Sequence, residues 1–125
     1  MSKANRNSVG LKGHDPVSYF EGKPTQGVVG ITAQYDGVTY NFASEQSRDR
    51  FGREPARFAP QYGGWCATAM GDGHVFDADP SNYRITDGLL YVFYKGPGGD
   101  TRPQWDQNPE ERRALADATW KRLNA

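Results

Sequence analysis

The chain has 125 residues, enough for one domain with its own hydrophobic core. Its 15 basic and 15 acidic residues cancel, so the charge gives no reason to expect a nucleic acid or a membrane surface as partner. The single cysteine, Cys66, excludes an intrachain disulfide and any metal cage built from several thiolates of one chain. No stretch is apolar enough to span a bilayer, and the first residues lack the apolar core of a signal peptide. We therefore expect a cytoplasmic protein as the sequence is written, or a periplasmic one if an export signal has been removed.

The N-terminal residues predict an arm followed by a short helix. Residues 1–12 are mostly polar, so we expect an N-terminal arm there and a single domain over residues 13–125. Asp15 can cap a short helix that has Pro16 at its first position.

Two Asp-Gly dipeptides predict two β-hairpins. Asp36-Gly37 and Asp87-Gly88 are typical of type I′ turns, and each separates two runs rich in β-branched or aromatic residues. The hairpins are expected at about residues 31–42 and 84–94.

Between and after the hairpins the pattern indicates short helices and a flexible segment. Ser44 can begin a helix, and residues 65–70 read as a helical turn with the Cys66 thiol near its start. There the unpaired N–H groups would favour a thiolate, and we also expect Cys66 to be partly accessible. The glycines of residues 96–99 indicate a hinge.

The C-terminal helix carries the clearest helical signals. Asn108 is a good N-cap and Pro109 suits the first helical position, which predicts a helix over residues 109–123. Leu115 and Trp120 would cover a sheet face. The fold class expected is α+β, in which a small antiparallel sheet from two hairpins packs against several short helices and a C-terminal helix.

Several separated motifs, in this order, resemble a YHS-domain protein of the small stand-alone bacterial group, over roughly residues 9–124. The residues that carry the resemblance are Gly13-His14-Asp15-Pro16-Val17-Ser18-Tyr19-Phe20, Tyr40-Asn41-Phe42-Ala43-Ser44, and Ala59-Pro60-Gln61-Tyr62-Gly63-Gly64-Trp65-Cys66-Ala67. The resemblance implies a fold and a metal-handling ancestry, because related domains of heavy-metal ATPases bind soft or borderline metals through thiolates.

This sequence departs from the thiol-bearing relatives at each corresponding position. The positions that correspond to the relatives' thiols, or lie next to them, are occupied here by Ser18, Ala43 and Ser47. Hydroxyl groups are poor ligands for soft metals, so those ligands are not carried over. Cys66 belongs to the motif of the stand-alone group itself.

A metal site in this chain would have to be built around Cys66. Met70 follows one helical turn later, His74 lies eight residues on, and His14 comes from the segment before the first helix. A Cys, Met and His donor set favours Cu(I), with Zn(II) second. A second chain that donates its own Cys66 is another route, which would produce a homodimer. For Met70 a role as a core side chain is the more common alternative, and for each histidine a structural or surface role is more common than metal ligation.

The other candidate is a non-catalytic binding module in which Cys66 is a small packed residue. Its ligand, a small molecule or a protein, would occupy an aromatic cleft lined by Tyr19, Tyr62 and Trp65. We do not expect an enzyme, because the sequence shows no phosphate loop, nucleophile elbow or zinc-protease motif. The alternative is a thiol-dependent enzyme in which Cys66 pairs with a histidine that is distant in the sequence but close in the fold.

Overall fold

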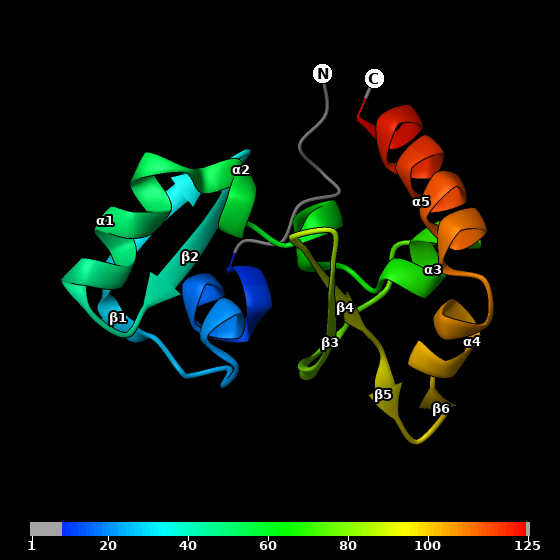
Figure 1. Ribbon diagram of the computed structural model, residues 1–125, viewed down its shortest axis with the longest axis horizontal. Helices are drawn as coiled ribbons and strands as arrows, with labels where there is room; N and C mark the ends of the chain where they lie inside the picture. Colours follow the sequence, from blue (N-terminus) through cyan, green and yellow to red (C-terminus); the bar gives the residue numbers. More distant parts are fainter. Residues whose placement is uncertain (1–8, 125) are drawn as a thin grey trace.

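The computed structural model describes residues 9–124 and has an α+β fold, as the sequence predicts. Its first half, on the left of Figure 1, contains 3₁₀ turns and a hairpin covered by helices: η1 (Gly10–Gly13), η2 (Pro16–Glu21), β1 (Val28–Tyr35), β2 (Val38–Phe42), α1 (Glu45–Arg53) and α2 (Pro55–Phe58). Its second half contains η3 (Gln61–Gly64), α3 (Ala67–Gly71), β3 (Asp79–Thr86), β4 (Leu89–Phe93), β5 (Lys95–Gly96), β6 (Gly99–Asp100), α4 (Arg102–Gln107) and α5 (Pro109–Leu123).

Both predicted hairpins form, and both turn at their Asp-Gly dipeptide. Asp36 and Gly37 have φ values of 52° and 81°, and Asp87 and Gly88 have 54° and 77°, as a type I′ turn requires. Strands β1 and β3 begin earlier than predicted, at Val28 and Asp79, because a register shift in each strand restores pairing beyond the expected end.

The predicted helix starts are confirmed by their capping hydrogen bonds. Asp15 accepts a hydrogen bond from the Val17 N–H at 2.8 Å, and Ser44 accepts one from the Ser47 N–H at 3.1 Å. Asn108 caps α5 in the same way, through the Glu111 N–H. Each side-chain oxygen satisfies a backbone donor that has no partner within its own helix.

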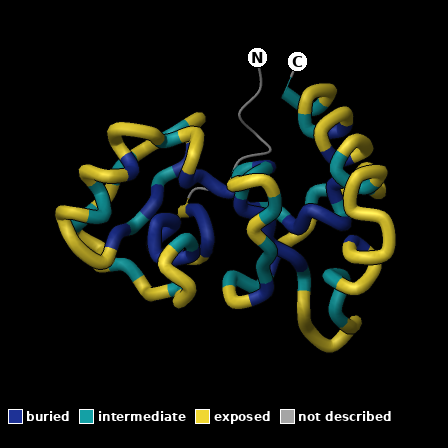
Figure 2. The backbone as a smooth tube through the Cα atoms, in the orientation of Figure 1, coloured by how far each residue is buried: buried dark blue, intermediate teal, exposed yellow. Residues whose placement is uncertain are grey.

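One hydrophobic cluster runs through both halves, as the buried segments of Figure 2 show. In the first half, Phe51 of α1 packs against Tyr40 and Phe42 of the β1–β2 hairpin. Tyr19 of η2 joins the halves, since its hydroxyl donates to the Pro80 carbonyl and its ring packs edge-on against Tyr83 of β3. A single buried core therefore spans both halves of the described chain.

The expected role of the C-terminal helix is wrong. Helix α5 packs mainly against α3; its buried residues are the small Ala116 and Thr119, whereas Leu115 is 49 % exposed. The strands form three separate two-stranded sheets, and the β3–β4 sheet is covered by Trp105 of α4, whose ring centroid lies 5.1 Å from Tyr91 and 5.4 Å from Phe93 of β4. Successive residues lie about 100° apart around a helix, so the burial of Ala116 turns the neighbouring Leu115 toward the exposed side.

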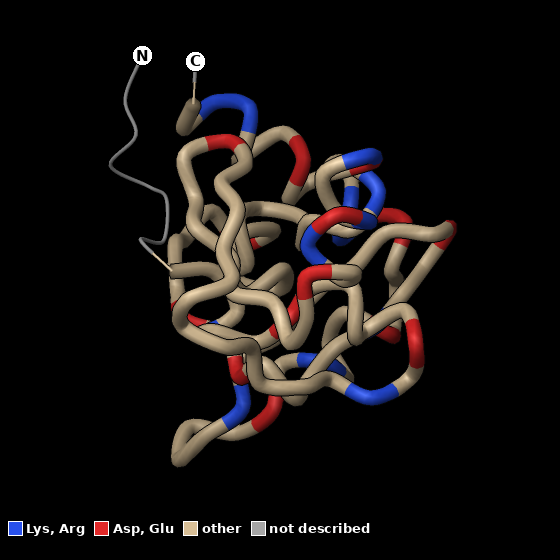
Figure 3. Tube along the Cα trace, turned by 90° about the vertical axis from the view of Figure 1, so that its left-hand side faces the viewer, with Lys and Arg blue, Asp and Glu red and all other residues tan. Residues whose placement is uncertain are grey.

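The Gly-rich segment expected to be a hinge is a tight two-residue hairpin, β5–β6. Basic and acidic residues are interspersed along the trace in Figure 3, in keeping with the balanced charge. Within residues 9–124, no helix combines the length and apolarity needed to cross a membrane.

Candidate functional site

Cys66 lies at the N-cap of α3, one residue before the helix that the sequence predicts to contain it. The preceding turn is bent by Tyr62 and Gly63, with φ values of 60° and 63°. Cys66 then bridges to Val92 of β4, and its N–H donates to the Phe76 carbonyl at 2.9 Å. The residue is 0 % exposed, so the expectation of a partly accessible thiol is wrong. It is buried because it bridges to a core strand, which no local pattern reveals.

The Cys66 sulfur is held by hydrogen bonds from two elements. Its Sγ accepts the Tyr94 N–H at 3.2 Å and the Ala69 N–H at 3.5 Å. The hydroxyl of Thr101 lies 3.3 Å from the same sulfur. The sulfur therefore has a fixed position, with backbone donors from the end of β4 and the first turn of α3 directed at it.

A pocket of about 230 Å³ adjoins Cys66. His74 lies in its wall and is exposed, while its backbone N–H donates to the Ala69 carbonyl at 2.9 Å. Phe76 and Tyr94 form an aromatic side of the pocket, with ring centroids 5.2 Å apart. Cys66 and one of the two histidines thus line a single pocket.

The other two metal candidates lie elsewhere. Met70 is 0 % exposed in the core and does not line this pocket. His14 lies in the first half of the chain, where its Nδ1 is 3.0 Å from the Leu11 carbonyl oxygen. Among residues 9–124, no three His, Cys, Asp or Glu side chains gather closely enough to hold a metal ion.

The three aromatic candidates have separate surroundings. Tyr19 donates to the Pro80 carbonyl and packs edge-on against Tyr83, whereas Tyr62 donates to Asp117 Oδ1 at 2.7 Å. Burial raises the pKa of Tyr19 and of Tyr62 above the ordinary tyrosine value, and for Tyr62 the Asp117 hydrogen bond adds to the effect. Trp65 is partly buried against the core. Tyr62 lines a pocket at the junction of the two halves that neither Tyr19 nor Trp65 lines.

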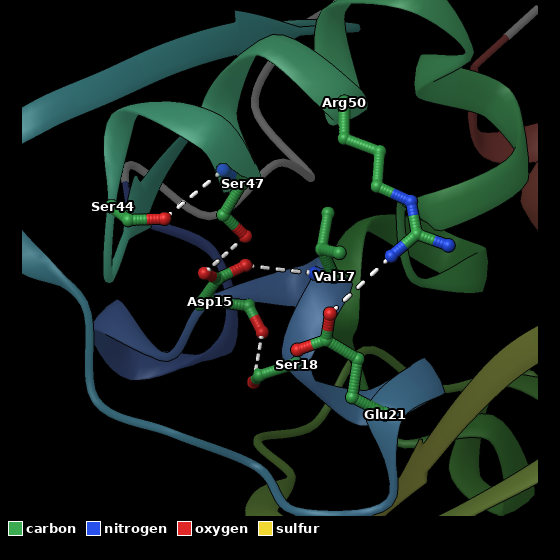
Figure 4. Close-up of polar contacts among 7 residues, drawn as sticks. All are labelled: Asp15, Val17, Ser18, Glu21, Ser44, Ser47 and Arg50. Carbon is green, nitrogen blue, oxygen red and sulfur yellow. Dashed lines mark hydrogen bonds and ion pairs between the residues drawn. The ribbon is translucent and has the colours of Figure 1, made fainter.

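A second polar centre surrounds Asp15, a carboxylate that is only 1 % exposed (Figure 4). Its Oδ1 accepts the Val17 N–H at 2.8 Å, and its Oδ2 accepts the Ser47 hydroxyl at 2.5 Å and the Ala43 N–H at 3.0 Å. The Ser18 hydroxyl donates to the Asp15 carbonyl oxygen at 2.5 Å. These donors offset the cost of burying a charge, so the centre joins η2, the end of β2 and α1.

A hollow of about 360 Å³ opens beside the Asp15 centre. Its wall includes several hydroxyl groups and the exposed ion pair between Arg50 and Glu21, whose Nη1 and Oε2 lie 3.3 Å apart. The sequence predicted only the local cap at Asp15. The contacts of Asp15 with Ala43 and Ser47 could not be predicted from a local pattern, because the partners are 28 and 32 residues away in the sequence.

Comparisons of the chain with protein-family models, with curated proteins and with solved structures find no match, so the geometry described above is the basis for any functional conclusion.

Proposed function

We propose that this chain is a non-catalytic YHS-like module that binds Cu(I) in the Cys66 pocket, with His74 as the second donor. The observation that carries the proposal is that Cys66 and His74 line the same small pocket. A thiolate and an imidazole are both good ligands for Cu(I), and the apolar side formed by Phe76 and Tyr94 would limit access of water.

The arrangement around Asp15 supports the family part of this proposal. Three residues, Ser18, Ala43 and Ser47, correspond to the thiol positions of the metal-binding relatives or lie next to them. All three form a hydrogen bond with Asp15. Because these three positions lie far apart in the sequence, a metal site shared by them in relatives would require a fold that brings them close together in space, as this fold does. In this chain they provide two hydroxyl groups and a backbone amide, which leaves Cys66 as the soft ligand.

The number of donors favours Cu(I) over Zn(II). Structural zinc sites use four protein ligands, whereas the pocket offers Cys66 and His74. The depth of Cys66 also bears on stoichiometry. A fully buried sulfur cannot meet the sulfur of a second chain without opening the pocket, so we expect one ion per chain.

A structural role for Cys66 is the second candidate function, and the burial of the residue favours it. The sulfur already accepts two backbone N–H groups and contacts a hydroxyl. In that case Cys66 only fastens α3 to the end of β4, and the protein binds a ligand elsewhere.

Titration of Cu(I) against a competing chelator distinguishes the two candidates. We expect one ion per chain, a loss of affinity of about tenfold or more in His74→Ala, and a larger loss in Cys66→Ser, since each removes one of two donors. His14→Ala is the matched control, because His14 lies in the other half of the molecule and should leave the affinity unchanged.

The result that overturns the metal proposal is an unchanged Cu(I) affinity in Cys66→Ser and His74→Ala. His74 is exposed, so His74→Ala is expected to fold and can be interpreted even if Cys66→Ser is unstable. One ion per two chains would instead indicate that Cys66 residues from two chains share the metal.

A further inference from the structure

The elements of the first half recur in the second half at a constant interval of 51 residues. Strands β3 and β4 begin and end 51 positions after β1 and β2, and the two Asp-Gly turns are separated by the same interval. The register shift of β1 lies between Val28 and Thr32, and that of β3 lies between Asp79 and Tyr83, again 51 positions later. The hairpins therefore correspond residue by residue, including their irregularities.

The turns that precede the hairpins correspond in the same way. Each contains three consecutive residues with positive φ: Leu11, Lys12 and Gly13 in η1, and Tyr62, Gly63 and Gly64 in η3. Residues other than glycine rarely adopt positive φ, because the side chain then crowds the backbone. A run of this kind that recurs after 51 residues is a specific similarity between the halves.

The helix that covers each hairpin also has a counterpart. Phe51 of α1 packs on Tyr40 and Phe42 of β2, with ring centroids 5.6 and 5.1 Å apart. Trp105 of α4 packs on the two β4 residues that lie 51 positions after these, at 5.1 and 5.4 Å. The two halves therefore share a core arrangement as well as an order of elements.

Sequence identity between the corresponding segments is low, so the repeat is not apparent from the sequence. Over residues 9–43 and 60–94, six of 35 paired positions are identical. Four of them have positive φ in both halves, and the other two are the aromatic residues on which Phe51 and Trp105 pack. The identical positions are thus those at which backbone conformation or core packing restricts the side chain.

Cys66 is the counterpart of Asp15, since it lies 51 residues later and also N-caps a helix. The main-chain N–H of each donates to the carbonyl ten residues later, at 2.8 and 2.9 Å. Asp15 Oδ2 accepts the N–H of Ala43 and Cys66 Sγ accepts that of Tyr94, which in each half is the residue after the second strand. A hydroxyl near the start of the next α-helix lies 2.5 Å from Oδ2 and 3.3 Å from Sγ. The sulfur therefore occupies the place that the carboxylate has in the first half.

The hollow beside Asp15 and the pocket beside Cys66 are in turn two copies of one pocket. Six residues of the hollow have their counterpart, 51 positions later, in the lining of the Cys66 pocket: Asp15, Val17, Ser18, Glu21, Thr25 and Ala43. The interval is defined by the strands and turns, so the agreement between the two linings is an independent observation.

We propose that the chain is a tandem repeat of one structural unit, and that each copy has a ligand pocket whose chemistry is set by two corresponding positions. The first position is Asp15 or Cys66, and the second is Lys23 or His74. The main-chain N–H of Lys23 and of His74 donates to the carbonyl five residues earlier, at 3.3 and 2.9 Å, so their backbones correspond too. A carboxylate and an ammonium group do not suit Cu(I), whereas a thiol and an imidazole do. The identity of the ligand rests on the proposed function, but the repeat does not.

Transplanting the two side chains tests the correspondence. Asp15→Cys combined with Lys23→His gives the first copy the donors of the second. We expect titration against a competing chelator to rise from one Cu(I) per chain to two, and the addition of Cys66→Ser to return it to one. The matched control is Asp15→Cys with Lys121→His, which places the histidine on α5. It should bind the second ion at least about tenfold more weakly, because one of the two donors is missing.

Urea unfolding gives a readout that does not depend on copper. Asp15→Cys should have a higher urea midpoint than Asp15→Ala, because a sulfur accepts the same donors as it does at Cys66 and a methyl group does not. Equal midpoints would overturn the correspondence of the two positions. A folded Asp15→Cys, Lys23→His variant that still binds one ion would overturn the assignment of the two pockets. If the unmodified protein binds no Cu(I), the proposed function fails, and the comparison of urea midpoints then decides the repeat alone.

Discussion

At the scale of single residues, Asp15 shows how one buried carboxylate can join distant segments. Both of its carboxylate oxygens accept hydrogen bonds, from a neighbour two residues on and from Ala43 and Ser47. A buried charge without such donors would be costly. The local cap could be predicted from the sequence, but the long-range contacts could not, since they depend on how β2 and α1 are placed.

We expect Asp15→Asn to lower the free energy of unfolding by about 2–3 kcal/mol, because hydrogen bonds to a charged group contribute about that much and an amide nitrogen cannot accept them. Urea unfolding at neutral pH measures the change. Ser44→Ala is the control: it removes an exposed cap of the same neighbourhood and should cost about 1 kcal/mol. A loss for Asp15→Asn that does not exceed that of Ser44→Ala would contradict a joining role.

For the candidate metal ligands too, the sequence could identify the residues but not their positions in the fold. The motif around Cys66 identified the residue and its place at a helix start, but not its complete burial, which results from the bridge to Val92. The separation of Met70 from the pocket also could not be predicted. Helical spacing places Met70 near Cys66 along the chain, yet the thioether enters the core while His74, beyond the helix end, lines the pocket.

At the scale of elements, the capped helices and Asp-Gly hairpins were predictable because their signals are local. Helix α4 was missed for the opposite reason. It has six residues, its single buried residue is Trp105, and it follows a Gly-rich segment, so it shows no apolar periodicity. The partner of α5 was also wrong, since an apolar stripe does not reveal which surface it will cover.

We expect Trp105→Ala to destabilise the protein by about 3–5 kcal/mol, the usual cost of removing a large buried aromatic side chain. Leu115→Ala, on the exposed side of α5, should change stability by no more than about 0.5 kcal/mol. Denaturant unfolding of the two variants compares the faces directly. If the larger loss came from Leu115→Ala, the packing of α4 and α5 described above would be incorrect.

At the scale of the whole molecule, buried tyrosines connect the core of both halves. Tyr19 and Tyr40 belong to the first half, and Tyr62 and Tyr91 to the second. Burial raises the pKa of each of these four phenols above the ordinary value of 10.0. They therefore keep their protons in the folded protein at pH values at which the unfolded chain has lost them.

This difference predicts that stability falls at alkaline pH. A group whose pKa is higher in the folded state contributes its full stability below the pKa of the unfolded chain, so the loss should begin near pH 10 and continue as the pH rises toward the folded values. Within that range, each such tyrosine lowers the free energy of unfolding by up to about 1.4 kcal/mol per pH unit.

Tyr40→Phe isolates one of these contributions, because it keeps the buried ring and removes the ionisable hydroxyl. We expect the free energy of unfolding of this variant to fall less steeply above pH 10 than that of the unmodified protein, by up to about 1.4 kcal/mol per pH unit. Urea unfolding at a series of pH values from 8 upward, at constant ionic strength, measures both slopes. Equal slopes would show that the Tyr40 hydroxyl ionises as readily in the folded protein as in the unfolded chain, and the core of the first half around Tyr40 would then be more open to water than its burial indicates.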